Sequence, residues 1–182
     1  MARLRIIRHG EAAATFGEAT DPPLSEAGQV QAAALADAMA TTPRAPIFSS
    51  PLVRARETAA PLAKKWGVSV AIAPMIREIP SPVDDLGERH TWLMEALGST
   101  WSAMPAEVQD WRYDIIAAST ALMFSQVWIS HYVVVNALAS FAMESDDVTV
   151  AQPGYCSVTE FDVTDGQLTI VKQGDEGITV IR

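Results

Sequence analysis

The chain has 182 residues, of which 49% are hydrophobic, and its formal net charge at pH 7 is -9. This length suits one domain with a sizeable core, and this hydrophobic content excludes a disordered chain. The acidic charge argues against a nucleic-acid partner, because such proteins present a basic face. We therefore expect a single domain over residues 1–182.

The cytoplasm is the expected compartment, on three grounds. No apolar run in the sequence reaches the length of a membrane span, so we expect no membrane association. Met1-Ala2-Arg3-Leu4 leads directly into strand residues, without the pattern of a signal peptide. Cys156 is the single cysteine, so an internal disulfide cannot form, which suits a reducing compartment.

Strand and helix patterns alternate through the first part of the chain. Strands are expected at three apolar runs, residues 3–8, 47–49 and 68–72. Ser25 is a candidate N-cap for an alanine-rich helix over 27–39. A second helix is expected to have Ser50 as its cap, Pro51 at its first position and Gly67 as its stop. This alternation predicts parallel strands with crossover helices.

The segment from about residue 80 to 125 interrupts this alternation with two helical stretches, near 89–97 and 106–124. Three tryptophans fall in or between them, and they either pack in a core or wall a substrate pocket: Trp92, Trp101 and Trp111. A strand at 126–130 and a helix at 132–143 follow, and Asp165-Gly166 predicts the turn of a hairpin.

Together these elements predict an α/β fold. We expect a three-layer sandwich with a mostly parallel central sheet, an inserted helical lobe at about residues 80–125 and a C-terminal hairpin. An exposed edge of such a sheet would leave room for a homodimer.

An Arg-His-Gly-Glu motif ends the first predicted strand. Arg8-His9-Gly10-Glu11 follows the apolar residues 4–7, and ligand sites in open α/β sheets lie at such strand ends. Histidine can act as a nucleophile toward phosphorus, arginine matches the planar arrangement of phosphate oxygens, and glycine lets an ester approach the backbone. The motif alone also fits a surface histidine in a turn.

Three further segments extend this motif into a family pattern. They are Leu24-Ser25-Glu26-Ala27-Gly28, Ser49-Ser50-Pro51-Leu52-Val53-Arg54-Ala55-Arg56-Glu57-Thr58-Ala59 and Val127-Trp128-Ile129-Ser130-His131. In this order, over about residues 3 to 140, the set resembles the histidine phosphatase superfamily, also called the phosphoglycerate mutase-like family, in its small single-domain phosphatase branch. The resemblance implies that the lobe at 80–125 covers the active site.

Four of these side chains are expected to act directly on the phosphoryl group. His9 is the predicted nucleophile, because one ring nitrogen of a neutral imidazole can attack while the other holds the proton. Arg8, Arg54 and His131 are expected to stabilise charge on the phosphoryl oxygens. Arg54 also lies in the first turn of a predicted helix, where phosphate is attracted to the helix N-terminus.

The leaving alkoxide needs a proton donor, and Glu78 is the candidate. It lies in an Arg-Glu-Ile segment, which carries the proton donor in many relatives, so the resemblance implies this role. We expect burial to hold its pKa near neutral, so that the acid can donate. Glu11, Asp84 and Asp85 are alternative donors, and Glu78 could also be an ordinary solvated residue.

Residues beside the two histidines are expected to bind substrate: Gly10, Glu11, Thr15, Ser130 and Tyr132. The chain also departs from the family pattern there. Relatives usually have glycine at the position of Tyr132, many have arginine at the position of Asn136, and many have asparagine within the segment 12–16.

The predicted function is metal-independent hydrolysis of a phosphomonoester through a phosphohistidine. The substrate would be a small phosphorylated metabolite or a phosphoprotein, and no cofactor and no metal ion is expected. Two alternatives stay open: a phosphoglycerate mutase-type transfer of the same phosphoryl group, and a non-catalytic protein that binds phosphate esters, which Tyr132 favours.

Overall fold

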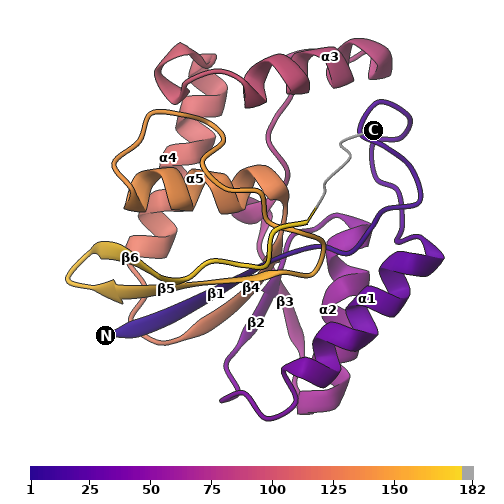
Figure 1. Cartoon of the computed structure of the whole chain (residues 1–182), viewed down its shortest axis with the longest axis vertical. Coiled ribbons are helices and arrows are strands. Elements are labelled where there is room, and N and C mark those ends of the chain that lie inside the picture. The colour runs from indigo at the N-terminus through magenta and orange to yellow at the C-terminus, as the bar shows by residue number, and fades with distance from the viewer. Residues whose placement is uncertain (178–182) are drawn as a thin grey trace.

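A six-stranded sheet forms the centre of the structure, a computed structural model that describes residues 1–177 (Figure 1). Its strands are β1 (Ala2–Arg8), β2 (Ile47–Ser49), β3 (Val70–Ile72), β4 (Gln126–Ser130), β5 (Val158–Thr164) and β6 (Gln167–Lys172). Their order is β3-β2-β4-β1-β5-β6. The first four strands are parallel, and β5 and β6 are antiparallel additions, so the predicted fold class is confirmed. The outermost strands are β3 and β6, and a homodimer through either edge stays a prediction.

Helices cover both faces of this sheet and give the three layers (Figure 1). They are α1 (Glu26–Ala38), α2 (Val53–Trp66), α3 (Leu86–Leu97), α4 (Ala106–Thr120) and α5 (Tyr132–Ala142), with two short 3₁₀ helices, η1 (Pro74–Ile76) and η2 (Trp101–Ala103). The core between the sheet and α1 and α2 includes Ile47, Leu62 and Trp66. The core on the other face, under α4 and α5, includes Ile115 and Trp128. No helix within residues 1–177 has the length and apolar character needed to cross a membrane.

Local sequence signals explain several element boundaries. The hydroxyl of Ser25 accepts a hydrogen bond from the Gly28 N–H at 3.0 Å and so caps α1 as expected. Gly67 ends α2 in the left-handed region, at φ 69°. Asp165 and Gly166, at φ 52° and 77°, form the two-residue turn between β5 and β6, which matches the predicted hairpin.

The predicted start of α2 was wrong by two residues. The helix begins at Val53 with Leu52 as its N-cap residue, so Ser50 does not cap it and Pro51 precedes it. The Ser50 hydroxyl instead lies 2.7 Å from Nε2 of His131. The side chain that sequence reasoning assigned to a helix end therefore belongs to the site described below.

The segment 80–125 contains α3, η2 and α4. Trp101 and Trp111 are buried in the core beneath α5, with ring centroids 6.5 Å apart, and Trp92 packs partly buried against the same core. The core alternative for the tryptophans is therefore favoured, and the second helix ends at Thr120 rather than near residue 124. That residues 1–182 form a single domain stays a prediction.

The sheet register brings distant parts of the sequence to one edge. Arg8, at the carboxyl end of β1, is paired with Ser130 of β4, and Ser49 of β2 is paired with Ile129. The residues that follow these three parallel strands, His9, His131 and Ser50, must therefore meet outside the same edge.

Candidate active site

Two histidines lie side by side where β1 and β4 end. The backbone N–H of His9 donates to the Ser130 carbonyl at 2.9 Å, which extends the strand pairing by one residue. The rings of His9 and His131 have centroids 5.1 Å apart and planes inclined by 64°. Both side chains are buried, His9 at 7% exposure and His131 at 0%.

The tautomer of His9 follows from its two hydrogen bonds. Its Nδ1 lies 2.6 Å from the Gly10 carbonyl oxygen, which can only accept, so Nδ1 carries the proton. Its Nε2 accepts a hydrogen bond from Nε of Arg54 at 3.1 Å, so Nε2 carries a lone pair. Burial, with the charges of His131 and Arg54, lowers the pKa of His9 well below its usual value, which keeps the ring neutral.

Arg54, in the first turn of α2, links the other charged groups. Its Nη2 lies 3.4 Å from Nδ1 of His131 and 3.5 Å from Oε2 of Glu78. Its Nη1 lies 3.9 Å from Oδ1 of Asp21. Arg54 is 5% exposed, so these contacts are made largely out of water, where electrostatic interactions are strong.

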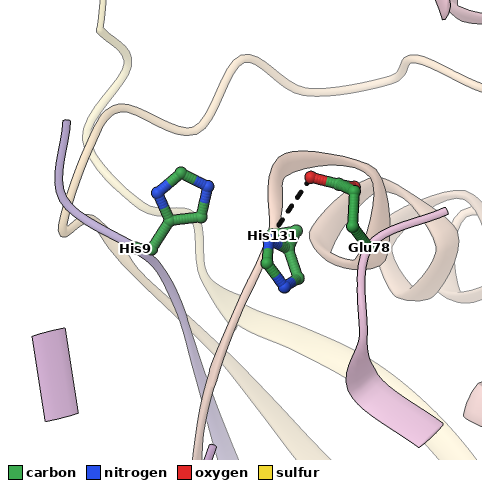
Figure 2. A group of neighbouring side chains, drawn as sticks. All are labelled: His9, Glu78 and His131. Carbon is green, nitrogen blue, oxygen red and sulfur yellow. Dashed lines mark ion pairs between the residues drawn. The ribbon is translucent and has the colours of Figure 1, made fainter. Parts of the chain in front are cut away.

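Glu78 follows η1 and points its carboxylate at His131, which lies between Glu78 and His9 in Figure 2. Oε2 of Glu78 lies 3.3 Å from Nδ1 of His131. Burial alone would raise the pKa of Glu78, but the facing His131 and Arg54 outweigh it and lower that pKa below its usual range. The expected near-neutral pKa is therefore wrong, because the sequence did not show which groups face the carboxylate.

Arg8 completes this inner cluster, defined as Arg8, His9, Arg54, Glu78 and His131. Its Nη1 donates to the Pro153 carbonyl at 2.9 Å. Its guanidinium lies 4.0 Å from the centroid of the Tyr155 ring and 5.2 Å from that of Tyr132, so two aromatic rings orient it. The structure thus brings together all five residues predicted to carry the chemistry.

A cavity of about 650 Å³ opens in front of this cluster. Its lining residues come from the end of β1 and the segment after it, from α2, α3 and α5, and from the loops after η1 and before β5: Arg8, His9, Glu11, Ala12, Ala13, Ala14, Thr15, Phe16, Glu18, Ala19, Pro22, Arg54, Glu78, Leu93, Leu97, Tyr132, Val133 and Tyr155. A cavity of this size can enclose a leaving group much larger than phosphate.

Comparison with known proteins identifies the family. The chain matches the model of the histidine phosphatase superfamily (branch 1) over residues 4–176. The chain belongs to this superfamily. The predicted resemblance is confirmed, and with it, at the level of the family, the prediction of a phosphatase.

Solved structures show the same histidine phosphatase fold. Bacillus stearothermophilus YhfR is 19% identical and superposes with a TM-score of 0.78, covering 97% of this chain and 98% of that chain. A mycobacterial glucosyl-3-phosphoglycerate phosphatase (20% identical, TM-score 0.70) covers 97% and 100%. A variant of phosphoserine phosphatase from Entamoeba histolytica, in complex with phosphoserine (20% identical, TM-score 0.74), covers 94% and 96%.

One curated relative is closer in sequence over a shorter stretch. The uncharacterized Mycobacterium tuberculosis protein Rv0525 is 38% identical over 80 residues. That match covers 42% of this histidine phosphatase and only 40% of the relative's own length.

The predicted substrate-binding residues divide into two groups. Glu11, Thr15 and Tyr132 line the cavity. Ser130 does not, because its buried hydroxyl donates to the Ile76 carbonyl at 2.8 Å. Gly10 has a packing role: a Cβ there would lie 2.8 Å from the backbone oxygen of Gly28, so glycine lets β1 end so close to α1. Its expected contact with an ester stays a prediction.

Two departures from the family pattern acquire structural roles. Oδ1 of Asn136 accepts hydrogen bonds from the backbone N–H groups of Val150 and Ala151, both at 2.9 Å. The Tyr132 hydroxyl donates to the Ala151 carbonyl at 3.1 Å. Both side chains therefore fix the loop that leads to Tyr155, whose ring stacks on Arg8.

Sequence reasoning missed Tyr155 and Asp21. Tyr155 lies in a loop without a recognisable motif, and its contact with Arg8 joins residues far apart in the chain. Asp21 stands directly before two prolines, and its Oδ1 accepts a hydrogen bond from the Val53 N–H at 2.8 Å. Neither role had a local signal in the sequence.

Three members of the cluster have the donor atoms of a metal site. Ligand atoms of His9, Glu78 and His131 all lie within 4.8 Å of one another (Figure 2). The Arg54 guanidinium already donates to His9 and faces the other two groups, so a fixed cation stands where a metal ion would bind. The donor set is therefore better matched to Arg54 and an incoming anion than to a metal ion.

Proposed function

We propose that this histidine phosphatase hydrolyses phosphomonoesters without a metal ion, through a phosphohistidine formed on His9. The carrying observation is the arrangement of the His9 ring. Nδ1 is held as a donor by the Gly10 carbonyl, and Nε2 keeps a lone pair beside Arg54. A neutral imidazole with one fixed tautomer is prepared for nucleophilic attack, and the lowered pKa of His9 keeps it so.

The proposed reaction has two displacements at phosphorus. In the first, Nε2 of His9 gives up its hydrogen bond from Arg54 and bonds to phosphorus, the bond to the ester oxygen breaks, and the alkoxide takes a proton from Glu78. In the second, water bonds to phosphorus while Glu78 takes its proton, and the N–P bond breaks to return its electron pair to Nε2. Arg8, Arg54 and the N–H of His131 stabilise the phosphoryl oxygens throughout.

Substrate binding supplies the protonated Glu78 that this scheme needs. Arg54 and His131 lower the pKa of Glu78 and so favour the ionised carboxylate. A bound phosphate places its own negative charge between these groups and so offsets them, which raises the pKa of Glu78. Protonation of Glu78 is thereby coupled to the arrival of the ester.

The substrate would be a small phosphorylated metabolite or a phosphoprotein. The phosphatases that share the fold act, by their names, on glucosyl-3-phosphoglycerate and on phosphoserine. These names support a small phosphomonoester as the class of substrate for this chain.

A phosphoenzyme trap tests the proposal. With a ³²P-labelled ester and acid-free quenching, wild type and the control His90→Ala should carry label that is acid-labile and base-stable, whereas His9→Ala should carry none and release no phosphate. Activity should survive EDTA. Label on protein lacking His9, or chelator-sensitive activity restored by a divalent ion, would overturn the mechanism, and label passed only to a second alcohol would favour the mutase alternative.

A further inference from the structure

The cavity is chemically divided between its inner cluster and the wall farther out. Among the described residues that line it, Arg8 and Arg54 are the cations, and both lie at the inner cluster. The cavity, at about 650 Å³, extends well beyond the space of one phosphoryl group. The side chains that line the cavity outside the inner cluster therefore decide which leaving groups can bind.

An apolar outer wall, defined as Phe16, Leu93, Leu97 and Val133, faces this space. Leu93 and Leu97 are four residues apart on α3, so they present one face of that helix. Arg89, also on α3, lies 4.3 Å from the ring centroid of Phe16 but does not line the cavity. The side chains that line the wall therefore offer dispersion contacts and desolvation, and carry no positive charge themselves.

The charged side chains that line the cavity outside the inner cluster are acidic. Glu11 and Glu18 both line the cavity. Glu11 is fixed by the Ser25 hydroxyl, which donates to its Oε1 at 2.7 Å. A carboxylate or second phosphate on a bound ester would thus lose water without gaining a cation, and would face like charge.

We propose that the preferred substrates are phosphomonoesters of apolar or aromatic alcohols that carry no second anionic group. This specificity rests on the proposed phosphatase function, and it assigns the outer wall as the binding site of the leaving group. An apolar group there gains from burial against Phe16 and the leucines of α3. A second anionic group is disfavoured because no side chain of the outer wall offers it a positive charge.

A matched pair of esters tests this specificity. Benzyl phosphate and 4-carboxybenzyl phosphate differ by one remote charge and have nearly equal leaving-group chemistry. We expect kcat/KM to be at least about tenfold higher for benzyl phosphate. The same ratio should appear in the dissociation constants of benzylphosphonate and 4-carboxybenzylphosphonate, which bind without being hydrolysed.

An added cation should reverse the preference. Leu97→Lys places an ammonium in the outer wall and should raise kcat/KM for the carboxylated ester relative to benzyl phosphate. Met94→Lys makes the same charge change on α3 at an exposed residue outside the cavity lining, and should leave the ratio as in wild type.

The two proposals fail in different ways. Equal or tighter binding of the carboxylated phosphonate, or an equal shift by both lysine variants, overturns the specificity. If no ester is hydrolysed while the phosphonates still differ by about tenfold, the phosphatase proposal fails and the binding preference stands.

Discussion

The inner cluster and the outer wall are built on opposite principles. In the inner cluster, every member is buried or nearly so, and four of the five are joined to one another by hydrogen bonds, ion pairs or a ring contact, as His9 is to Arg54 and Glu78 to His131. The outer wall is made of side chains from a loop, α3 and α5, which belong to one hydrophobic cluster or pack against it.

This difference separates chemistry from specificity. A transition state with fixed charge distribution requires groups held to fractions of an ångström, and such groups are placed best by strand ends and a helix terminus. A leaving group is held by the burial of apolar surface and by the absence of like charge around it. Apolar side chains are sufficient for both. Variants of the inner cluster should therefore change rate, and variants of the outer wall should change substrate choice.

Among variants that keep the nucleophile, Arg54→Ala should have the largest effect, because it removes one side chain that touches His9, His131 and Glu78. We expect kcat/KM to fall by about 10³-fold or more for every ester, as for other arginines that stabilise phosphoryl transfer. Arg54→Lys keeps the charge but cannot reproduce the planar set of donors, so it should recover only part of the rate.

The matched control for this prediction is Arg56→Ala, since Arg56 is exposed on the same helix. It should retain wild-type kinetics for both benzyl esters. A loss confined to one ester in Arg54→Ala would contradict the separation of the two regions, and circular dichroism would show that each variant is folded.

Glu78→Gln should have an effect that depends on the leaving group. If Glu78 supplies the proton, an alkyl ester should lose about 10²–10⁴-fold in kcat, whereas para-nitrophenyl phosphate, whose leaving group departs without a proton, should lose little. Steady-state kinetics over a series of leaving groups measure this. The same substitution at an exposed rival, Asp84→Asn, should leave the series unchanged. Equal losses for both ester types would move the acid role to another carboxyl, such as Glu11.

The inner cluster was largely predictable from the sequence because its parts are local. A histidine or arginine placed directly after an apolar strand, as in Arg8-His9 and Ser130-His131, must lie at the sheet edge once the strands are parallel. The sequence could not predict the direction of the Glu78 pKa shift, since that depends on which charges face the carboxylate across three separate elements.

The outer wall was not predictable for the same physical reason. Leu93 and Leu97 carry the periodicity of any helix with one buried side, and that pattern does not tell a core face from a cavity face. Tyr155 and Asp21 act through contacts with residues far away in the sequence. Ser50 illustrates the opposite error. Its sequence context gave a strong local signal for a helix N-cap, but its hydroxyl contacts His131 instead.

The smallest effect is expected for the pH dependence of the free energy of unfolding, which tests the electrostatics of the inner cluster. Burial lowers the pKa of both His9 and His131, so below their ordinary value of about 6.5 the unfolded chain binds more protons than the folded one. The free energy of unfolding should therefore be fully retained above about pH 6.5 and fall as the pH drops below it. The lowered pKa of Glu78 adds a further loss near and below about pH 4.3.

Urea unfolding at pH 7, 6 and 5 measures this slope. One proton corresponds to at most about 1.4 kcal/mol per pH unit, and His9→Gln should reduce the wild-type slope by up to that amount because it removes one of the two buried rings. His90→Gln, on α3 and outside the inner cluster, should keep the wild-type slope. If His9→Gln keeps the wild-type slope while His90→Gln reduces it, the neutral, buried state assigned to the nucleophile is wrong. The electrostatic contrast between the inner cluster and the outer wall is then wrong as well.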